Sequence, residues 1–301
     1  MGKPEKIKRR KGSSYLSAYA FALPYLLLFF VFVVLPVLIS VFLSLTDFNV
    51  LQIPDFIGPA NYLTLFLDDD IFLIALKNTL IFAAIVGPGG YLLCFFFAWC
   101  LNELPPKLRA LFVLCLYAPS ISGNAYLIWT LLFNSDSYGY LNGILFNFGI
   151  LYEPVRWFNN TKYIVPLVIM ILLWMSLGTS LLVFIAAFQG MDRSLYEAAA
   201  VDGLRNRWQE LWYITLPSMK PQLMFGAVMS ITGAFGIGDA ITGLTGNPST
   251  KYAAHTLMHH LQDYGGARFE MGYASAIAVV LFAMMVGANQ LVQKLLSRVG
   301  E

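Results

Sequence analysis

Several polar side chains lie inside otherwise apolar stretches of this 301-residue sequence. Hydroxyl and carboxylate oxygens can hydrogen-bond to a polar solute, and an indole can stack on one. Polar groups are costly in an apolar environment, so we expect them at an internal cavity or at an interface. The residues concerned, from two of the stretches, are Trp174, Ser176, Thr179, Ser180, Ser230, Thr232 and Asp239.

Catalytic arrangements are missing from the sequence. It contains no Ser/His/Asp or HExxH pattern and no carboxylate pair at catalytic spacing, so a membrane-embedded enzyme is a remote alternative. It also lacks the G-x-x-x-x-G-K-[ST] phosphate loop, and residues 87–90 (Gly-Pro-Gly-Gly) predict a kink or close helix packing instead. His255, His259 and His260 have no acidic ligand at suitable spacing. We therefore expect no metal site, and we expect these histidines on an interfacial helix that contacts a partner protein.

The composition excludes an ordinary soluble protein. Hydrophobic residues make up 58% of the chain and charged residues 12%. Soluble domains contain roughly 45–50% apolar residues and about 25% charged residues. Most of the surface must therefore face lipid. The net charge of +2 is too small to indicate a nucleic-acid partner.

Six segments are long and apolar enough to cross a bilayer as helices. The sequence therefore predicts an all-α membrane protein with a transmembrane domain over residues 18–295, between a basic N-terminal segment (1–17) and a short tail (296–301). The predicted spans lie at about residues 18–45, 73–100, 110–133, 162–188, 222–245 and 271–294.

The distribution of positive charge predicts the orientation. Cytoplasmic segments of membrane proteins are enriched in Lys and Arg, and most of the 19 such residues fall on one side if both termini are cytoplasmic. Those on that side are Lys3, Lys6, Lys8, Arg9, Arg10, Lys11, Lys107, Arg109, Arg193, Arg205, Arg207, Lys220, Lys294 and Arg298. The outer segments carry Lys77, Arg156, Lys162, Lys251 and Arg268.

The predicted cytoplasmic segment at about residues 190–221 contains two helical patterns. Strong helix formers follow Asp192 and Ser194, which are placed to cap them. Asp202-Gly203 then ends the first helix, because glycine tolerates the backbone conformation of a C-terminal turn.

The second pattern runs from residue 205 to residue 213. Trp208, Leu211 and Trp212 follow helical spacing and predict one apolar face. Leu216-Pro217 is expected to stop this helix. Such a helix pair either docks on a partner protein or lies on lipid headgroups.

The order of residues in this segment closely resembles the signature loop of binding-protein-dependent ABC importer permeases. That pattern reads E-A-A-x-x-x-D-G, then I-x-L-P, then a further proline. The matching residues are Glu197-Ala198-Ala199, Asp202-Gly203, Ile214, Leu216-Pro217 and Pro221. Softer matches, among them Asn61-Tyr62 and Gly246-Asn247-Pro248, resemble the sugar subclass, which takes up oligosaccharides, glycosides and glycerol phosphates.

The resemblance implies the type I importer permease fold, with a coupling helix in the loop between spans four and five. It also implies a second homologous permease subunit, two ATPase subunits that bind ATP and Mg, an extracytoplasmic solute-binding protein and a bacterial or archaeal cytoplasmic membrane. Glu197 would contact an ATPase arginine, and Gly203 would let the helix project. No cofactor is expected in this chain.

By analogy with maltose-type permeases, the substrate pathway lies between spans four and five. Ser176, Thr179 and Ser230 are then the main candidates for substrate contact, with Trp174 able to stack on a sugar. Thr232 and Asp239 belong to the same set, although contact with interfacial water is the simplest expectation for Asp239.

Two further alternatives remain open. The solute could be a polyamine, an amino acid or phosphate instead of a sugar. A secondary transporter would require inverted repeats and charged residues at the bilayer midplane, and the six spans show neither clearly.

Overall fold

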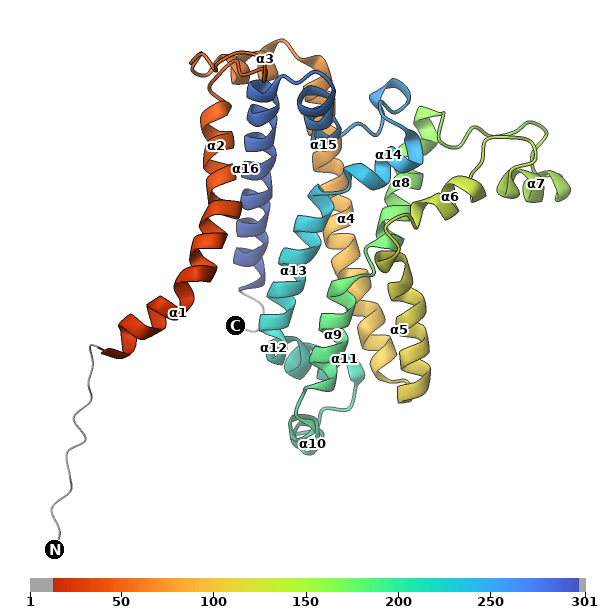
Figure 1. Ribbon diagram of the computed structural model, residues 1–301. Coiled ribbons are helices and arrows are strands. Elements are labelled where there is room, and N and C mark those ends of the chain that lie inside the picture. Colours follow the sequence, from red (N-terminus) through yellow and green to blue (C-terminus); the bar gives the residue numbers. More distant parts are fainter. Residues whose placement is uncertain (1–12, 298–301) are drawn as a thin grey trace, which may run out of the picture.

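The computed structural model describes residues 13–297 and is built from helices. Within these residues the only β-pairing is an isolated bridge between Thr46 and Phe56. The long helices run side by side, and one short helix, α10 (Arg193–Val201), projects from one end of the bundle (Figure 1). The opposite end, where α3 and α15 lie, is called the outer side below. The predicted segments 1–17 and 296–301 fall largely outside the described residues.

The first span is one long helical run that α1 (Ser13–Phe29), η1 (Phe30–Val34, a π-helical turn) and α2 (Leu35–Leu43) form together. Its α2 part packs against α16, and its α1 part turns away from the bundle (Figure 1). Large apolar side chains along it are exposed, for example Phe21 at 92% and Phe32 at 72%. This surface suits lipid or a neighbouring membrane protein.

A short cap follows on the outer side. The Asn61 side chain, in α3 (Ala60–Leu67), donates hydrogen bonds to the backbone oxygens of Ser44 and Thr46 at 2.9 and 2.8 Å. The buried amide thus fixes α3 on the end of the first span.

The central helix is α4 (Asp70–Asn102), capped by Asp69, and it packs against α9, α13 and α8. Its glycines permit close approach, as the sequence predicts for residues 87–90. A Cβ on Gly90 would lie 2.5 Å from the Ser176 hydroxyl, and one on Gly89 would lie 2.9 Å from Leu173. Side chains are therefore excluded along this part of α4.

The third predicted span is not a single helix. α5 (Pro106–Ile121) and α6 (Tyr126–Leu132) are bent by 89° at a short break. The break falls at Ser122, Gly123 and Asn124, whose residue types favour turns over helix interiors. The predicted span over residues 110–133 is therefore a bent helix pair and not one continuous helix. α7 (Tyr140–Asn147) follows beyond α6.

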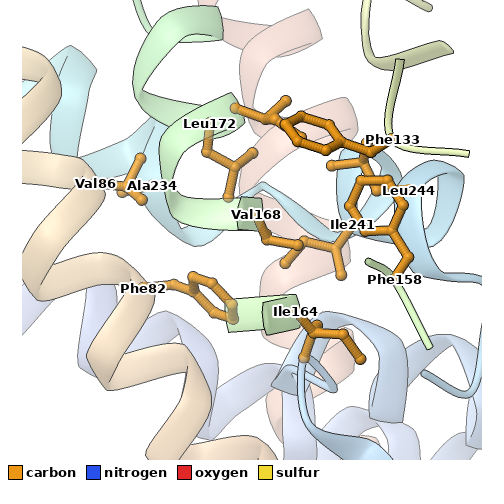
Figure 2. Packing of buried hydrophobic residues seen from close by; sticks show 12 residues of the cluster. Phe82, Val86, Phe133, Phe158, Ile164, Val168, Leu172, Ala234, Ile241 and Leu244 are labelled. Carbon is orange, nitrogen blue, oxygen red and sulfur yellow. The ribbon is translucent and has the colours of Figure 1, made fainter. Parts of the chain in front are cut away.

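The fourth and fifth predicted spans are bent helix pairs. α8 (Thr161–Met175) and α9 (Thr179–Gln189) meet at 41°, and α13 (Lys220–Phe235) and α14 (Gly238–Thr245) meet at 43°. Both breaks contain glycine, at Gly178 and at Gly236. One buried hydrophobic cluster joins the two pairs. It includes Val168 of α8 and Ile241 of α14, together with Phe82 of α4 (Figure 2).

The chain ends with a short outer helix and a long span. η3 (Thr250–Tyr252), α15 (Leu257–Gln262) and η4 (Asp263–Ala267) form the outer segment, and α16 (Met271–Leu296) returns through the bundle. Within residues 13–297, three helical runs are long and apolar enough to cross a membrane, and the number rises to six if each bent pair is one span.

Candidate functional site

The projecting loop begins with α10, whose start agrees with the sequence prediction. The Asp192 carboxylate accepts a hydrogen bond from the Ser194 backbone N–H at 2.9 Å and caps the helix. This bond lowers the pKa of Asp192. Ser194 lies inside the first turn of α10 and supplies this N–H, so Asp192 is the N-cap.

The end of α10 is a tight turn at Gly203. The Gly203 N–H bonds to the Ala200 oxygen and the Leu204 N–H to the Ala199 oxygen, at 3.3 and 3.0 Å, which is the Schellman arrangement. Gly203 has φ +95°, and no heavy atom lies within 4 Å of the position of a Cβ. Glycine is therefore required here by the backbone conformation and not by a lack of space for a side chain.

Most of the signature residues on α10 face solvent. Glu197 and Ala198 are exposed, as are Asp202 and Gly203, whereas Ala199 is buried. An exposed carboxylate on a capped, projecting helix is available to a partner's cation. The structure thus shows Glu197 exposed on the projecting helix.

The second part of the loop is a continuous helical run. α11 (Arg207–Glu210) leads into the π-helical η2 (Leu211–Thr215) and then into α12 (Leu216–Ser218). The run passes through Leu216-Pro217 and ends at Ser218, one residue after the predicted stop. Pro217 lies in the first turn of α12, where its missing N–H is tolerated. The chain then enters α13 at Lys220, with Pro221 in its first turn as expected.

The predicted apolar face of this run is divided. Leu211 is buried and 6% exposed, whereas Trp208 and Trp212 are 64% and 67% exposed. Ile214 is intermediate. The widened π-helical turn changes the spacing after residue 210, so the prediction of one face from regular α-helical periodicity fails.

Two contacts that the sequence did not reveal attach the loop to the bundle, and two more hold the loop together. The Arg207 guanidinium pairs with Glu103, just after α4, at 2.9 Å, and with Glu210 at 3.1 Å. The Trp208 ring lies 5.2 Å from that of Trp99. The hydroxyls of Tyr196 and Thr215 are 2.9 Å apart and join α10 to η2.

A polar cavity of about 510 Å³ lies between the loop and the adjacent ends of α4, α5 and α9. Its lining includes Arg109, Arg193, Glu197 and Tyr196. Space of this kind beside α10 leaves room for side chains of a docked partner.

A second cavity lies at the two helix breaks, where the candidate pathway residues meet. It measures about 300 Å³ and is lined by Ser176, Thr179 and Ser230, together with Ser180. The Ser180 and Ser230 hydroxyls lie 3.3 Å apart across α9 and α13. The structure thus brings together the three residues that the sequence favoured and adds the Ser180–Ser230 pair.

The other pathway candidates lie elsewhere. Trp174 packs edge-on against Trp129, with ring centroids 5.3 Å apart. Thr232 is exposed and does not line the cavity. Asp239 is also exposed, and its carboxylate accepts a hydrogen bond from Gln262 at 3.3 Å.

The three outer histidines are buried, at 4%, 1% and 2% exposure for His255, His259 and His260. The His260 Nε2 lies 2.8 Å from the Asp69 carboxylate, which also accepts a hydrogen bond from Tyr273. His259 and His260 lie on the short outer helix α15, and the histidine side chains pack within the chain, so any contact of this segment with a partner protein involves other side chains. No group of metal-binding side chains occurs in the described part of the chain.

The bent helices around a hydroxyl-lined cavity, together with the projecting capped helix, define a transport subunit of the membrane. Residues 6–300 match the family described as "Binding-protein-dependent transport system inner membrane component", and the chain belongs to this family. It is therefore a permease component of an importer and not an enzyme.

The chain matches curated relatives over most of their length. The chain is 31% identical over 92% of its length to the arabinooligosaccharides transport system permease protein AraP of Bacillus subtilis, 87% of which is covered. It is 29% identical to the lactose transport system permease protein LacF of Rhizobium radiobacter, with 90% of each chain covered.

A solved structure has the same fold. A chain of the bacterial alginate ABC transporter, in complex with its alginate-pentasaccharide-bound periplasmic protein, superposes with a TM-score of 0.75 at 26% identity. The match covers 94% of this chain and 96% of that one. The type I importer permease fold that the sequence predicts is confirmed.

Proposed function

We propose that this chain forms half of the translocation pathway of an ATP-driven sugar importer. Its 190–221 loop docks on an ATPase subunit, and the hydroxyl-lined cavity between the bent helices forms part of the solute path. The relatives named for arabinooligosaccharides and lactose favour a sugar over a polyamine, amino acid or phosphate.

The observation that carries the proposal is α10. It is capped by Asp192, ended by the Gly203 turn and displaced from the bundle, with Glu197 exposed on it. Its attachments at Arg207 and Trp208 join the loop to the end of α4. Movement of α10 with a closing ATPase would then reach the central helix directly.

The proposed complex contains a second homologous permease, two ATPase subunits that bind ATP and Mg, and an extracytoplasmic binding protein. Each bent pair is one span, which makes six, and both termini are cytoplasmic. α10 then lies in the cytoplasm, and α3 and α15 lie on the extracytoplasmic side (Figure 1).

Hydroxyl groups suit the proposed cargo. Ser176, Thr179 and Ser230 can donate hydrogen bonds to sugar hydroxyls or accept them. A bound sugar can also replace the hydrogen bond between Ser180 and Ser230 with bonds of its own. Because the contact is 3.3 Å long and between neutral groups, replacing it costs little.

The test is ATP hydrolysis by the purified complex in lipid nanodiscs, with its binding protein loaded with one solute at a time. Oligosaccharides and simple glycosides are compared with spermidine, amino acids and phosphate. Stimulation by a sugar-loaded protein is the expected result. Stimulation by a non-sugar solute alone would contradict the sugar assignment.

A further inference from the structure

A polar groove of about 500 Å³ lies on the outer side, where the chain enters α8. It is called the outer groove here, and Arg156, Lys251, Glu153, Asn160, Tyr163 and Thr250 are among its lining residues. Arg156 and Lys251 are exposed, and within residues 13–297 neither forms an ion pair. Two cations and one acid give the groove a net positive charge.

Buried side chains hold the Arg156 backbone in place. The Asn142 amide is fully buried and bonds to both neighbours of Arg156. It exchanges two hydrogen bonds with the Val155 backbone, at 3.2 and 3.3 Å, and accepts one from the Trp157 indole at 3.0 Å. Arg156 is therefore presented from a fixed segment.

The Lys251 turn is held in a similar way and is also strained. Lys251 and Tyr252 have φ values of +50° and +57°, a conformation that costs energy for residues with a Cβ. The Asn78 side chain donates to the oxygens of Tyr252 and His255 at 3.0 and 2.9 Å. The buried Ser249 hydroxyl accepts from the Ala254 N–H at 3.0 Å.

A strained backbone that buried side chains hold in place often marks a functional residue, and here that residue is Lys251. A fixed pair of cations loses little freedom on binding, so it is prepared for an anionic partner. The groove is lined largely by polar residues and is wide enough for several side chains, which suits a protein surface.

We propose that the outer groove receives a carboxylate-bearing loop of the extracytoplasmic binding protein, with Arg156 and Lys251 as the two contacts. This proposal rests on the orientation and partner set proposed above. It assigns the groove to docking of the binding protein and not to the solute. Charges at such a rim accelerate association and determine its salt dependence.

The test uses the assembled complex in nanodiscs with its sugar-loaded binding protein. The concentration of binding protein that gives half-maximal ATPase stimulation is measured for the wild type, Arg156→Gln, Lys251→Gln and the double variant. We expect the double variant to raise this half-maximal concentration roughly tenfold and to make it less dependent on salt. Maximal stimulation and basal hydrolysis should be unchanged. Lys77→Gln, which removes an exposed cation outside the groove, serves as the matched control.

Charge reversal provides a second arm. Arg156→Glu combined with Lys251→Glu should weaken stimulation further, and Asp/Glu→Lys substitutions on the permease-facing lobe of the binding protein should partly restore it. Unchanged half-maximal concentrations in the Gln variants would overturn the proposal. So would an altered solute dependence at unchanged binding-protein affinity, because the groove would then belong to the solute. Failure of the binding protein to stimulate the wild-type complex would instead reject the proposed function itself.

Discussion

The buried Asn142 amide shows how much one polar side chain can organise in this protein. Its Nδ2 donates to the oxygens of Asn134, Asp136 and Val155, while its Oδ1 accepts from Val155 and Trp157. In the sequence Asn142 simply follows the third predicted span. Its bonding partners up to 15 residues away could not be predicted, because they depend on how the segment folds back on itself.

Replacement of Asn142 by Ala should therefore lower stability substantially. It would leave several buried backbone groups without partners, and we expect a loss of about 3 kcal/mol in the free energy of unfolding. Thermal unfolding of the purified protein in detergent would measure this loss. Asn159→Ala is the control, because Asn159 is exposed in the same outer segment. Equal melting temperatures for the two variants would contradict the structural role of Asn142.

The buried histidines predict that acid weakens the outer side. Burial lowers the pKa of His255 and of His259 to about 4, and the neighbouring histidines contribute to this shift for His255. Because the folded pKa lies below the ordinary value of about 6.5, an unfolded or opened state binds more protons between these values. Stability should therefore fall as pH decreases from about 6.5 toward 4, by on the order of 3 kcal/mol per histidine.

Other charged groups around the cluster modify this acid response. Asp69 and Asp263 favour a charged His255, and Asp239 favours a charged His259. Burial of Asp69 raises its pKa, but hydrogen bonds from Phe72, Tyr273 and His260 outweigh this, so its pKa stays below the usual value. Its stabilising bonds are thus lost only at still lower pH. The test is the melting temperature as a function of pH, measured for the wild type and for a His255→Gln, His259→Gln double variant. Identical curves for the two proteins would refute the predicted role of the histidines in acid sensitivity.

At the scale of elements, the loop between α9 and α13 shows where sequence reasoning succeeds and fails. The cap at Asp192 and the turn at Gly203 depend on neighbours within a few residues, and both were predictable. The π-helical turn at η2 and the Arg207–Glu103 pair were not. The pair joins residues 104 apart, so it depends on the packing of whole helices. The 89° bend between α5 and α6 falls at Ser122-Gly123-Asn124. This turn-forming stretch was in the sequence, but it is so short that the apolar residues on either side of it were read as one span.

Gly203→Val should uncouple the loop while leaving the spans inserted. A β-branched residue is strained at φ +95° by about 1–2 kcal/mol, and the turn should rearrange to relieve this. We expect sugar-stimulated ATP hydrolysis to fall roughly tenfold, with normal amounts of protein in the membrane. Gly149→Val is the matched control, since Gly149 also has positive φ and open space but lies in the segment after α7. Normal sugar-stimulated ATP hydrolysis by the Gly203 variant would count against a docking role for α10.

At the scale of the whole molecule, the charge distribution makes the proposed orientation testable. We expect a cysteine at residue 297, beside Lys220, to react with a membrane-impermeant maleimide only after the cells are opened. A cysteine in place of Tyr138, which is 98% exposed between α6 and α7, should react in intact cells. Both variants are made after Cys94, Cys100 and Cys115 are replaced by Ala. Labelling of residue 297 in intact cells would reverse the assignment of the two sides.

The glycines of α4 also determine how this bundle can move. Along residues 87–90 the helix presents bare backbone to Leu173, Ser176 and Ala234. Interlocked side chains would have to climb over one another when helices shift, whereas a smooth backbone offers no such obstacle. These neighbours lie at the ends of α8 and α13, next to the two helix breaks, so we expect the bent helices to shift along α4 by small shear steps. Alternating exposure of the cavity to the two sides would then proceed with little repacking of the outer core.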